Sequence, residues 1–497
     1  MSIQNLSTAL LLSSAIALSA CGKKKPASVD LSALTIASLE AQTEIKSASI
    51  DESSAMTALS ALRLSEDAGP FDWAAMSGSS GTYEYTDFAP DNGGFSADKM
   101  IVSGVTQGES PEFDRIEFQR LEMGSTLIES LVLANPVDGK SVPFIQGLLG
   151  DKPSVALMGE HFEAGIIQTY SFDIPEADMS GGGQTIAFGP SADGKNRDII
   201  IEGMSLFFDM TEFEMQIDMG ALKVTGASPK YLSIMVDTYA GVMPEGNSIY
   251  MHNYADEFEV LDLTMKFGEE VSVEMPRFYG TATQLKGGGY SSVSYFEKSK
   301  IILPPSDELT KIFGGNELSF FGETDQTVDV AKDRMTVDRF YLEFPENFNI
   351  NFEIDLSGMI ELQNSYAGKT MAEMMMADEM AFVPDIDLIR FSFEDSGLMD
   401  RVWKMAAEEQ EQKPAMLKQQ AKMGLMMLPA MAEDDSEKKL MTEMAEALDG
   451  FIDDGGTLIF EMKPEGGFDF SNLENMDTPE IRGELLDGMG LKFKHKK

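Results

Sequence analysis

The chain has 497 residues, of which 43% are hydrophobic, so its length and composition are those of a globular protein of about three domains. Asp and Glu number 83 against 38 Lys and Arg, which gives a formal net charge of −45. This excess of acid argues against nucleic-acid binding, because phosphate contacts need clustered Lys and Arg, and against electrostatic docking on anionic lipid. With one cysteine, the chain forms no internal disulfide.

An uncharged apolar segment, Leu6–Ala20, follows the N-terminus. Its roughly 15 residues are fewer than the about 20 that a spanning helix needs, and they fit the apolar region of a secretory signal. The segment runs into Leu18-Ser19-Ala20-Cys21-Gly22, which holds the one cysteine. This sequence resembles the lipobox of bacterial lipoproteins. The resemblance implies a signal peptide over 1–20, cleavage before Cys21, and lipidation of Cys21 on its thiol and its new amino group.

The lipobox resemblance also implies a location. In that family a residue other than Asp after the cysteine implies sorting to the outer membrane, so Gly22 implies the periplasmic face of that membrane. Two alternatives remain. Met1–Asn5 has no Lys or Arg, whereas Lys23–Lys25 follow the apolar segment, a charge order typical of a reverse signal-anchor. An unmodified, buried thiol at Cys21 is the other alternative.

Residues 21–67 are rich in Ala, Ser and Leu and predict a lipid-anchored tether. Its first part, Lys23–Pro26, is typical of a flexible spacer. Short helices are expected within Leu31–Leu64, because Ala and Leu favour them.

The region 68–395 is dominated by hydrophobic residues at every second position, the pattern of half-buried strands. The clearest runs predict antiparallel hairpins with one apolar and one acidic face; they are 213–219, 261–267, 271–275, 340–344 and 348–356. No helical crossovers separate them, so we expect a mainly β fold, α+β overall with the helices near the C-terminus. Whether the strands close into a sandwich or barrel, or leave an open groove for an acyl chain, stays open.

Towards the C-terminus the spacing of the hydrophobic residues changes from the strand pattern to the helix pattern. A short Met-rich helix is expected at Lys369–Met380, and 396–452 predict a helical segment. Leu398 begins its first helix, Pro414 suits the first turn of the second, and Asp434 with Glu437 forms a capping-box pattern for the third. Residues 453–497 predict a strand at 457–462 and then a loose tail that ends in Lys492–Lys497.

Few residues are candidates for catalysis or metal binding. The three histidines, His161, His252 and His495, lie far apart in the sequence and form no metal-ligand pattern. Ser96-Ala97-Asp98-Lys99 matches S-x-x-K, but the partner motifs of penicillin-binding enzymes are absent. We therefore predict no catalytic residues, no metal site and no cofactor.

The chain has 35 methionines, and some of them form two clusters, at Met371–Met380 and Met423–Met431. Thioethers are soft ligands that favour Cu(I), so a copper site is one hypothesis. The other is that methionine fills irregular cores and lines adaptable apolar surfaces.

The sequence as a whole predicts a lipid-anchored envelope protein that acts by binding or scaffolding, not an enzyme. Its expected partners are the membrane and a hydrophobic small molecule or lipid. The alternatives are a hydrolase that uses acidic residues and a purely structural spacer.

Overall fold

The computed structural model describes the residues 29–44, 76–79, 82–88, 95–104, 113–137, 161–175, 178–210, 213–229, 255–268, 271–305, 308–359, 385–432, 434–466, 468 and 485–497. They fall into two compact units, here called the first unit (29–265) and the second unit (266–497). The predicted signal peptide, Cys21 and the Met-rich helix at Lys369–Met380 lie outside the described residues.

The first unit is an antiparallel meander in which each strand from β1 to β9 pairs with the next along the chain, and β10 pairs with β9. Its strands are β1 (Met76–Ser79), β2 (Thr82–Phe88), β3 (Phe95–Ser103), β4 (Arg115–Met123), β5 (Thr126–Pro136), β6 (Phe162–Ile174), β7 (Met179–Pro190), β8 (Arg197–Met210), β9 (Phe213–Ala227) and β10 (Glu257–Phe267). The alternating runs at 213–219 and 261–267 lie in β9 and β10, as predicted.

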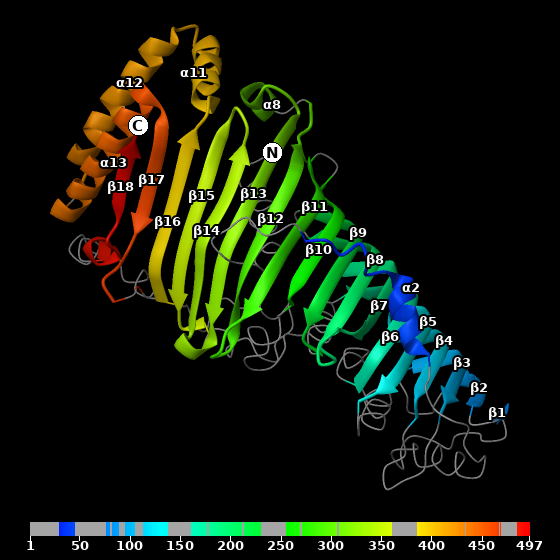
Figure 1. Ribbon diagram of the computed structural model, residues 1–497. Coiled ribbons are helices and arrows are strands. Elements are labelled where there is room, and N and C mark those ends of the chain that lie inside the picture. The colour runs from blue at the N-terminus through cyan, green and yellow to red at the C-terminus, as the bar shows by residue number, and fades with distance from the viewer. Residues whose placement is uncertain are drawn as a thin grey trace. The chain divides into compact units, whose positions relative to one another are not determined.

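A short N-terminal segment, here called the strap (residues 29–44), packs on one face of this sheet (Figure 1). It contains α2 (Ile36–Glu40) and the 3-10 turn η1 (Ala41–Thr43). Leu39, 1% exposed, packs against a cross-strand row of apolar side chains, namely Val132, Ile166, Ala187 and Ile200. Lys223, the partner of Ile200 on β9, donates to the carbonyl oxygens of Leu31 (3.2 Å) and Leu34 (3.0 Å). The strap, which is part of the predicted tether, therefore packs on the sheet, and α2 confirms a short helix within Leu31–Leu64.

The second unit is also an antiparallel meander, and each of its strands from β11 to β18 pairs with the next. The strands are β11 (Val271–Gln284), β12 (Gly289–Ile302), β13 (Glu317–Asp329), β14 (Arg334–Phe344), β15 (Phe348–Ser357), β16 (Asp385–Asp395), β17 (Gly456–Met462) and β18 (Lys492–Lys496). The predicted hairpin about Pro345–Asn347 is confirmed, since Phe344 pairs with Phe348. The loose tail was wrong for Lys492–Lys496, which form a strand because Phe493 alternates with lysines.

The longer helices lie at the β16–β18 end of the sheet (Figure 1). The longer ones are α11 (Leu398–Glu409), α12 (Pro414–Met427) and α13 (Asp435–Asp454); the shorter ones are α8 (Glu308–Phe313), η4 (Val330–Lys332) and η5 (Leu428–Ala430). Pro414 occupies the first turn of α12, and Asp434 caps α13 by accepting from the Glu437 amide at 2.8 Å, both as predicted. No helix among the described residues is long and apolar enough to cross a bilayer.

A chain of aromatic rings joins these helices to the sheet. Phe348 stacks on Phe344 of β14 and on Phe393 of β16, with ring centroids 4.4 and 5.4 Å apart. Phe393 in turn meets Phe451 of α13 at 6.0 Å, edge to face. Phe451 is 5% exposed, so α13 closes this end of the apolar face.

The described chain is thus mainly antiparallel β with C-terminal helices, the α+β class that the alternating runs predicted. Among the described strands β18 pairs with β17 alone, so the sheet of the second unit has an open edge there.

Removing the Leu39 side chain tests the packing of the strap. Leu39→Ala should lower the free energy of unfolding by about 2–5 kcal/mol, because a fully buried leucine leaves a cavity. Urea unfolding measures this loss, with the exposed neighbour Glu40→Ala as the control. Equal stability of the two variants would contradict the packed strap.

Candidate ligand-binding face

One face of the second unit contains a continuous row of residues paired in register from β11 to β18. Its first part consists of small and polar residues, Gly280, Ser294 and Thr324. Its second part is here called the phenylalanine row and consists of one Phe on each of five adjacent strands, namely Phe340, Phe352, Phe391, Phe460 and Phe493. Five neighbouring strands therefore present the same aromatic side chain at one level of the sheet.

A second row runs beside the first on the same face, since its members lie two positions further along most strands. It begins with Ala282, Ser292 and Gln326 and continues with the apolar residues Val337, Ile354, Ile389 and Met462. On β14 the spacing between the rows is three residues, because a bulge adds Asp338, which points to solvent. The bulge keeps Val337 and Phe340 on one face.

The four polar members of these rows, Ser292, Ser294, Thr324 and Gln326, are here called the polar end. They are buried, with exposed fractions between 0% and 4%. The Ser294 and Thr324 hydroxyls share a hydrogen bond of 2.8 Å. The Ser292 Oγ and the Gln326 Oε1 have no hydrogen-bond partner among the described residues. Because Ser292 and Gln326 are cross-strand partners, these two unsatisfied atoms lie on neighbouring positions.

The phenylalanine row is less buried than the polar end. Phe391, at its centre, is 37% exposed, and Phe352 and Phe460 beside it are half-buried. Beyond the row, Ile386 and Met462 are closed off by Phe468. The face is therefore covered on either side of the row, by the aromatic chain with α13 and by the Phe468 cluster, while the row itself retains contact with solvent.

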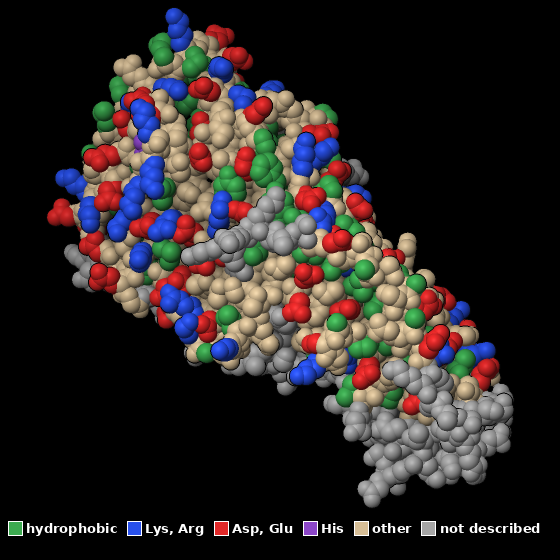
Figure 2. Space-filling view, in the orientation of Figure 1, with side chains coloured by type: hydrophobic (Ala, Val, Ile, Leu, Met, Phe, Trp, Pro, Cys, Tyr) green, Lys and Arg blue, Asp and Glu red, His purple; other side chains and the backbone are tan. Residues whose placement is uncertain are grey.

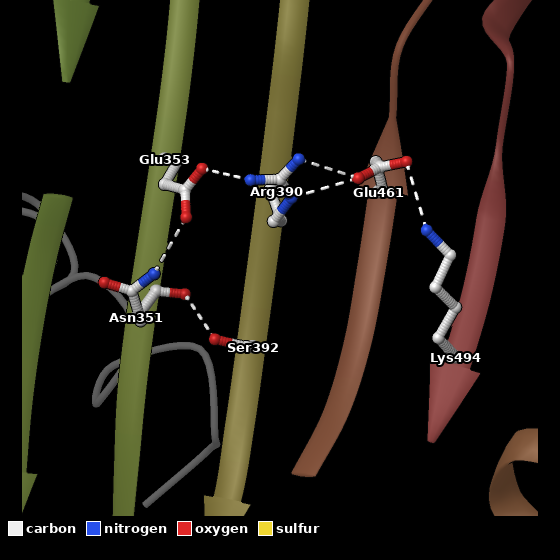
Figure 3. Close-up of polar contacts among 6 residues, drawn as sticks. All are labelled: Asn351, Glu353, Arg390, Ser392, Glu461 and Lys494. Atoms are coloured by element: carbon white, nitrogen blue, oxygen red, sulfur yellow. Dashed lines mark hydrogen bonds and ion pairs between the residues drawn. The ribbon is translucent and has the colours of Figure 1, made fainter. Parts of the chain in front are cut away.

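The opposite face of the same strands carries a ladder of ion pairs. Arg390 of β16 pairs with Glu353 on β15 and with Glu461 on β17, the latter at 2.9 Å, and Lys494 of β18 follows at 3.4 Å from Glu461 (Figure 3). Asn351 donates to Glu353 at 3.3 Å. Figure 2 shows Lys and Arg side chains interspersed with Asp and Glu over β16–β18. This face is saturated with charge and offers no surface to an apolar ligand.

The ladder also affects the acid–base chemistry of its carboxylates. Burial opposes ionisation of Glu461, but the Arg390 hydrogen bond and the charges of Lys494 and Arg390 outweigh it, so the pKa of Glu461 lies below its ordinary value. A hydrolase that uses a carboxyl group as its general acid needs the pKa of that group to be raised. Glu461, the most buried acid of this face, is tuned in the opposite direction.

The structure does not bring the sequence-derived candidates together. His161 is buried in the first unit, His495 contacts the Gly455 carbonyl at 2.6 Å in the second, and His252 lies outside the described residues. Lys99 of the S-x-x-K match is bound to Glu84 at 2.9 Å. Within the described ranges, no group of three or more His, Cys, Asp or Glu residues could hold a metal ion.

The methionines fall into two environments. Those of the strands, such as Met215, Met265 and Met275, are buried core residues, as one hypothesis predicted. Five others are exposed on α12 and directly after η5, with exposed fractions from 52% to 73%; they are Met416, Met423, Met426, Met427 and Met431. These side chains are an accessible apolar surface of the adaptable kind. The copper hypothesis stays untested.

Comparison with known proteins gives few matches. A family profile described as "Uncharacterized protein" matches residues 341–496, from β14 to β18. None of the curated proteins matches the chain, and no enzyme family is identified. A solved structure described as "Asymmetric conductivity of engineered proteins" is 8% identical and covers 56% of this chain and 84% of its own, with a TM-score of 0.15. A mutant porin of Rh. blastica is 8% identical and covers 58% and 85%, also at 0.15. At such TM-scores these likenesses carry no argument.

The pKa of Glu461 gives a pH-dependent prediction. Because its folded-state pKa is depressed, its contribution is complete above the unfolded value, near 4.5, and is lost as the pH falls through the lower folded value. Glu461→Gln should therefore lower the unfolding free energy by about 1–3 kcal/mol at pH 7, with the difference from wild type shrinking towards zero below pH 4.5.

Denaturant unfolding between pH 3 and pH 7 measures this difference. The two limits lie about one unit or more below and above the pKa values of ordinary carboxyl groups. The exposed Glu465→Gln removes the same charge nearby and is the matched control. A Glu461 variant whose deficit is constant over the whole range would show that the ladder does not depress this pKa.

Proposed function

We propose that this chain is a lipid-anchored protein of the bacterial envelope and that its second unit binds a hydrophobic ligand, such as a lipid tail, across the phenylalanine row. The observation that carries the proposal is the row itself: five in-register phenylalanines on five strands, with Phe391 at the centre 37% exposed. Adjoining apolar side chains that keep contact with solvent as one patch are typical of sites that bind a ligand or a partner.

The dimensions of the row suit a lipid tail. Neighbouring strands lie about 4.8 Å apart, so the four steps from β14 to β18 span about 19 Å. One leaflet of a bilayer is half of a hydrocarbon core about 30 Å thick, which gives a lipid tail a length of about 15 Å. A tail that lies perpendicular to the strands would therefore contact most of the five rings.

Two features of the same unit confine the proposed site to the phenylalanine row. The opposite face is covered by the Arg390 ladder, where an apolar chain would strip water from paired charges. The aromatic chain from Phe344 to Phe451 is closed by α13, so it forms core and not surface.

The strap gives the proposed anchor a geometric consequence. Cys21 precedes Val29, the first buried residue of the strap, by eight residues. Eight fully extended steps reach about 28 Å. An acylated Cys21 would therefore hold the strap-covered face of the first unit within about 28 Å of the lipid surface, far closer than a free tether of residues 21–67 would.

A charge in the phenylalanine row tests ligand binding. Phe391→Asp should weaken the binding of a fluorescent fatty-acyl probe by about tenfold or more, because a tail would then bury an unpaired carboxylate. Fluorescence titration of the purified chain measures the Kd.

Phe207 provides a matched control for this substitution. It is 38% exposed and pairs with Ser180 and Gln216 on a polar face of the first unit, so Phe207→Asp should leave the Kd unchanged. Equal effects of the two substitutions, or no binding by wild type, would refute the binding face.

The anchor has its own test. Cys21→Ser should abolish fatty-acid labelling and move the protein from the membrane fraction to the soluble fraction, or leave an uncleaved precursor, because serine lacks the thiol that receives the lipid. Metabolic labelling and fractionation measure both effects. Unchanged retention and electrophoretic mobility would exclude lipidation at Cys21.

A further inference from the structure

The polar end and the phenylalanine row adjoin on one face, and this arrangement bears on the ligand's head group. Thr324 of the polar end is the direct cross-strand partner of Phe340, the first ring of the row. Gln326 pairs in the same way with Val337. A molecule that lies across the strands would therefore meet hydrocarbon over β14–β18 and hydroxyl and amide groups over β12–β13.

Two atoms of the polar end are buried and have no hydrogen-bond partner among the described residues. Ser294 and Thr324 satisfy each other, whereas the Ser292 Oγ and the Gln326 Oε1 are buried without a partner there. A buried, unsatisfied polar atom costs about 1–3 kcal/mol. Ser292 can donate or accept and the Gln326 oxygen accepts, so together they match a hydroxyl, ester or amide group.

The polar end has no charged neighbour on its own face among the described residues of β11–β15. Along β11–β15 the described residues that share the face with the polar end are all neutral, whereas charged residues of these strands form pairs such as Lys300–Glu317 and Arg339–Glu323 away from it. A phosphate or carboxylate placed at Ser292 and Gln326 would be buried without a counter-ion, at a large cost. A neutral polar head carries no such cost.

We infer that the ligand of this face is a neutral amphiphile whose hydroxyl- or ester-bearing head binds Ser292 and Gln326 while its acyl tail lies on the phenylalanine row. This inference rests on the proposed function and adds the class of head group to it. In this arrangement Ser292 and Gln326 determine the specificity for the head group, and the phenylalanine row binds the tail.

Two probes with the same acyl chain test the inference. The purified full chain carrying Cys21→Ser, which has no acyl groups of its own, is titrated with monooleoylglycerol and with oleate at pH 8, each below the concentration at which it aggregates. We expect monooleoylglycerol to bind at least about tenfold more tightly than ionised oleate, a preference equivalent to about 1.4 kcal/mol. Equal affinities, or a preference for oleate, would overturn the inference and leave the proposed function standing. No binding of either probe would refute the proposed function itself.

A double substitution assigns the preference to the two residues. Ser292→Ala with Gln326→Leu should reduce the affinity for monooleoylglycerol to that for oleate and leave the oleate affinity unchanged. The variant is expected to fold, because it replaces two unsatisfied buried groups by apolar ones of similar size. Ser319→Ala on the same sheet, in register with Lys300, is the matched control and should retain the preference. Retention of the preference in the double variant would overturn the assignment.

Discussion

The register of the antiparallel strands is the constraint on which the second unit depends. Side chains alternate between the two faces of a strand, so a shift of one residue between β15 and β16 would place Arg390 against the apolar face and Phe391 among the charges. The ion ladder and the phenylalanine row are thus two consequences of one register. Both the ladder and the row make a register shift destabilising, because the charges would lose their partners and the rings would be exposed to water. A sheet with such different faces specifies its own pairing.

Closure of the apolar surface is achieved differently in each unit. In the first, the strap covers a four-strand apolar row and is held by Lys223 through two backbone carbonyls. In the second, α13 covers the aromatic chain at Phe451, and Lys492–Lys496 alternate charge along the edge strand β18. Lysines on an exposed edge oppose pairing with another sheet. The phenylalanine row therefore keeps contact with solvent, although α13 covers the apolar surface next to it and the lysines of β18 protect the sheet edge.

Local signals in the sequence were sufficient for the elements but not for the site. The alternation of Phe348–Leu356, the proline of α12 and the Asp434 cap each depend on a few neighbouring residues, and each was predicted. The five phenylalanines come from segments up to about 150 residues apart, and their alignment depends on turn lengths and on the bulge at Asp338. The sequence contains alternating serines at Ser292 and Ser294, but only the strand register shows that they lie next to the phenylalanine row. The short helix of the strap was expected within Leu31–Leu64, but its packing on the sheet was not, because its contacts are with strands distant in sequence.

The polar end indicates that this face does more than form part of a packed core. A sheet that served only as a spacer would be more stable with valine or isoleucine at Ser292 and Gln326, since both sites are buried and two of their polar atoms are unsatisfied. Departures from local stability rules are expected where a protein binds or acts. Here the departure lies in register beside exposed aromatic rings, and no charge accompanies it on that face of β11–β15 among the described residues. A hydrocarbon tail with a neutral head is the ligand chemistry that uses both features at once.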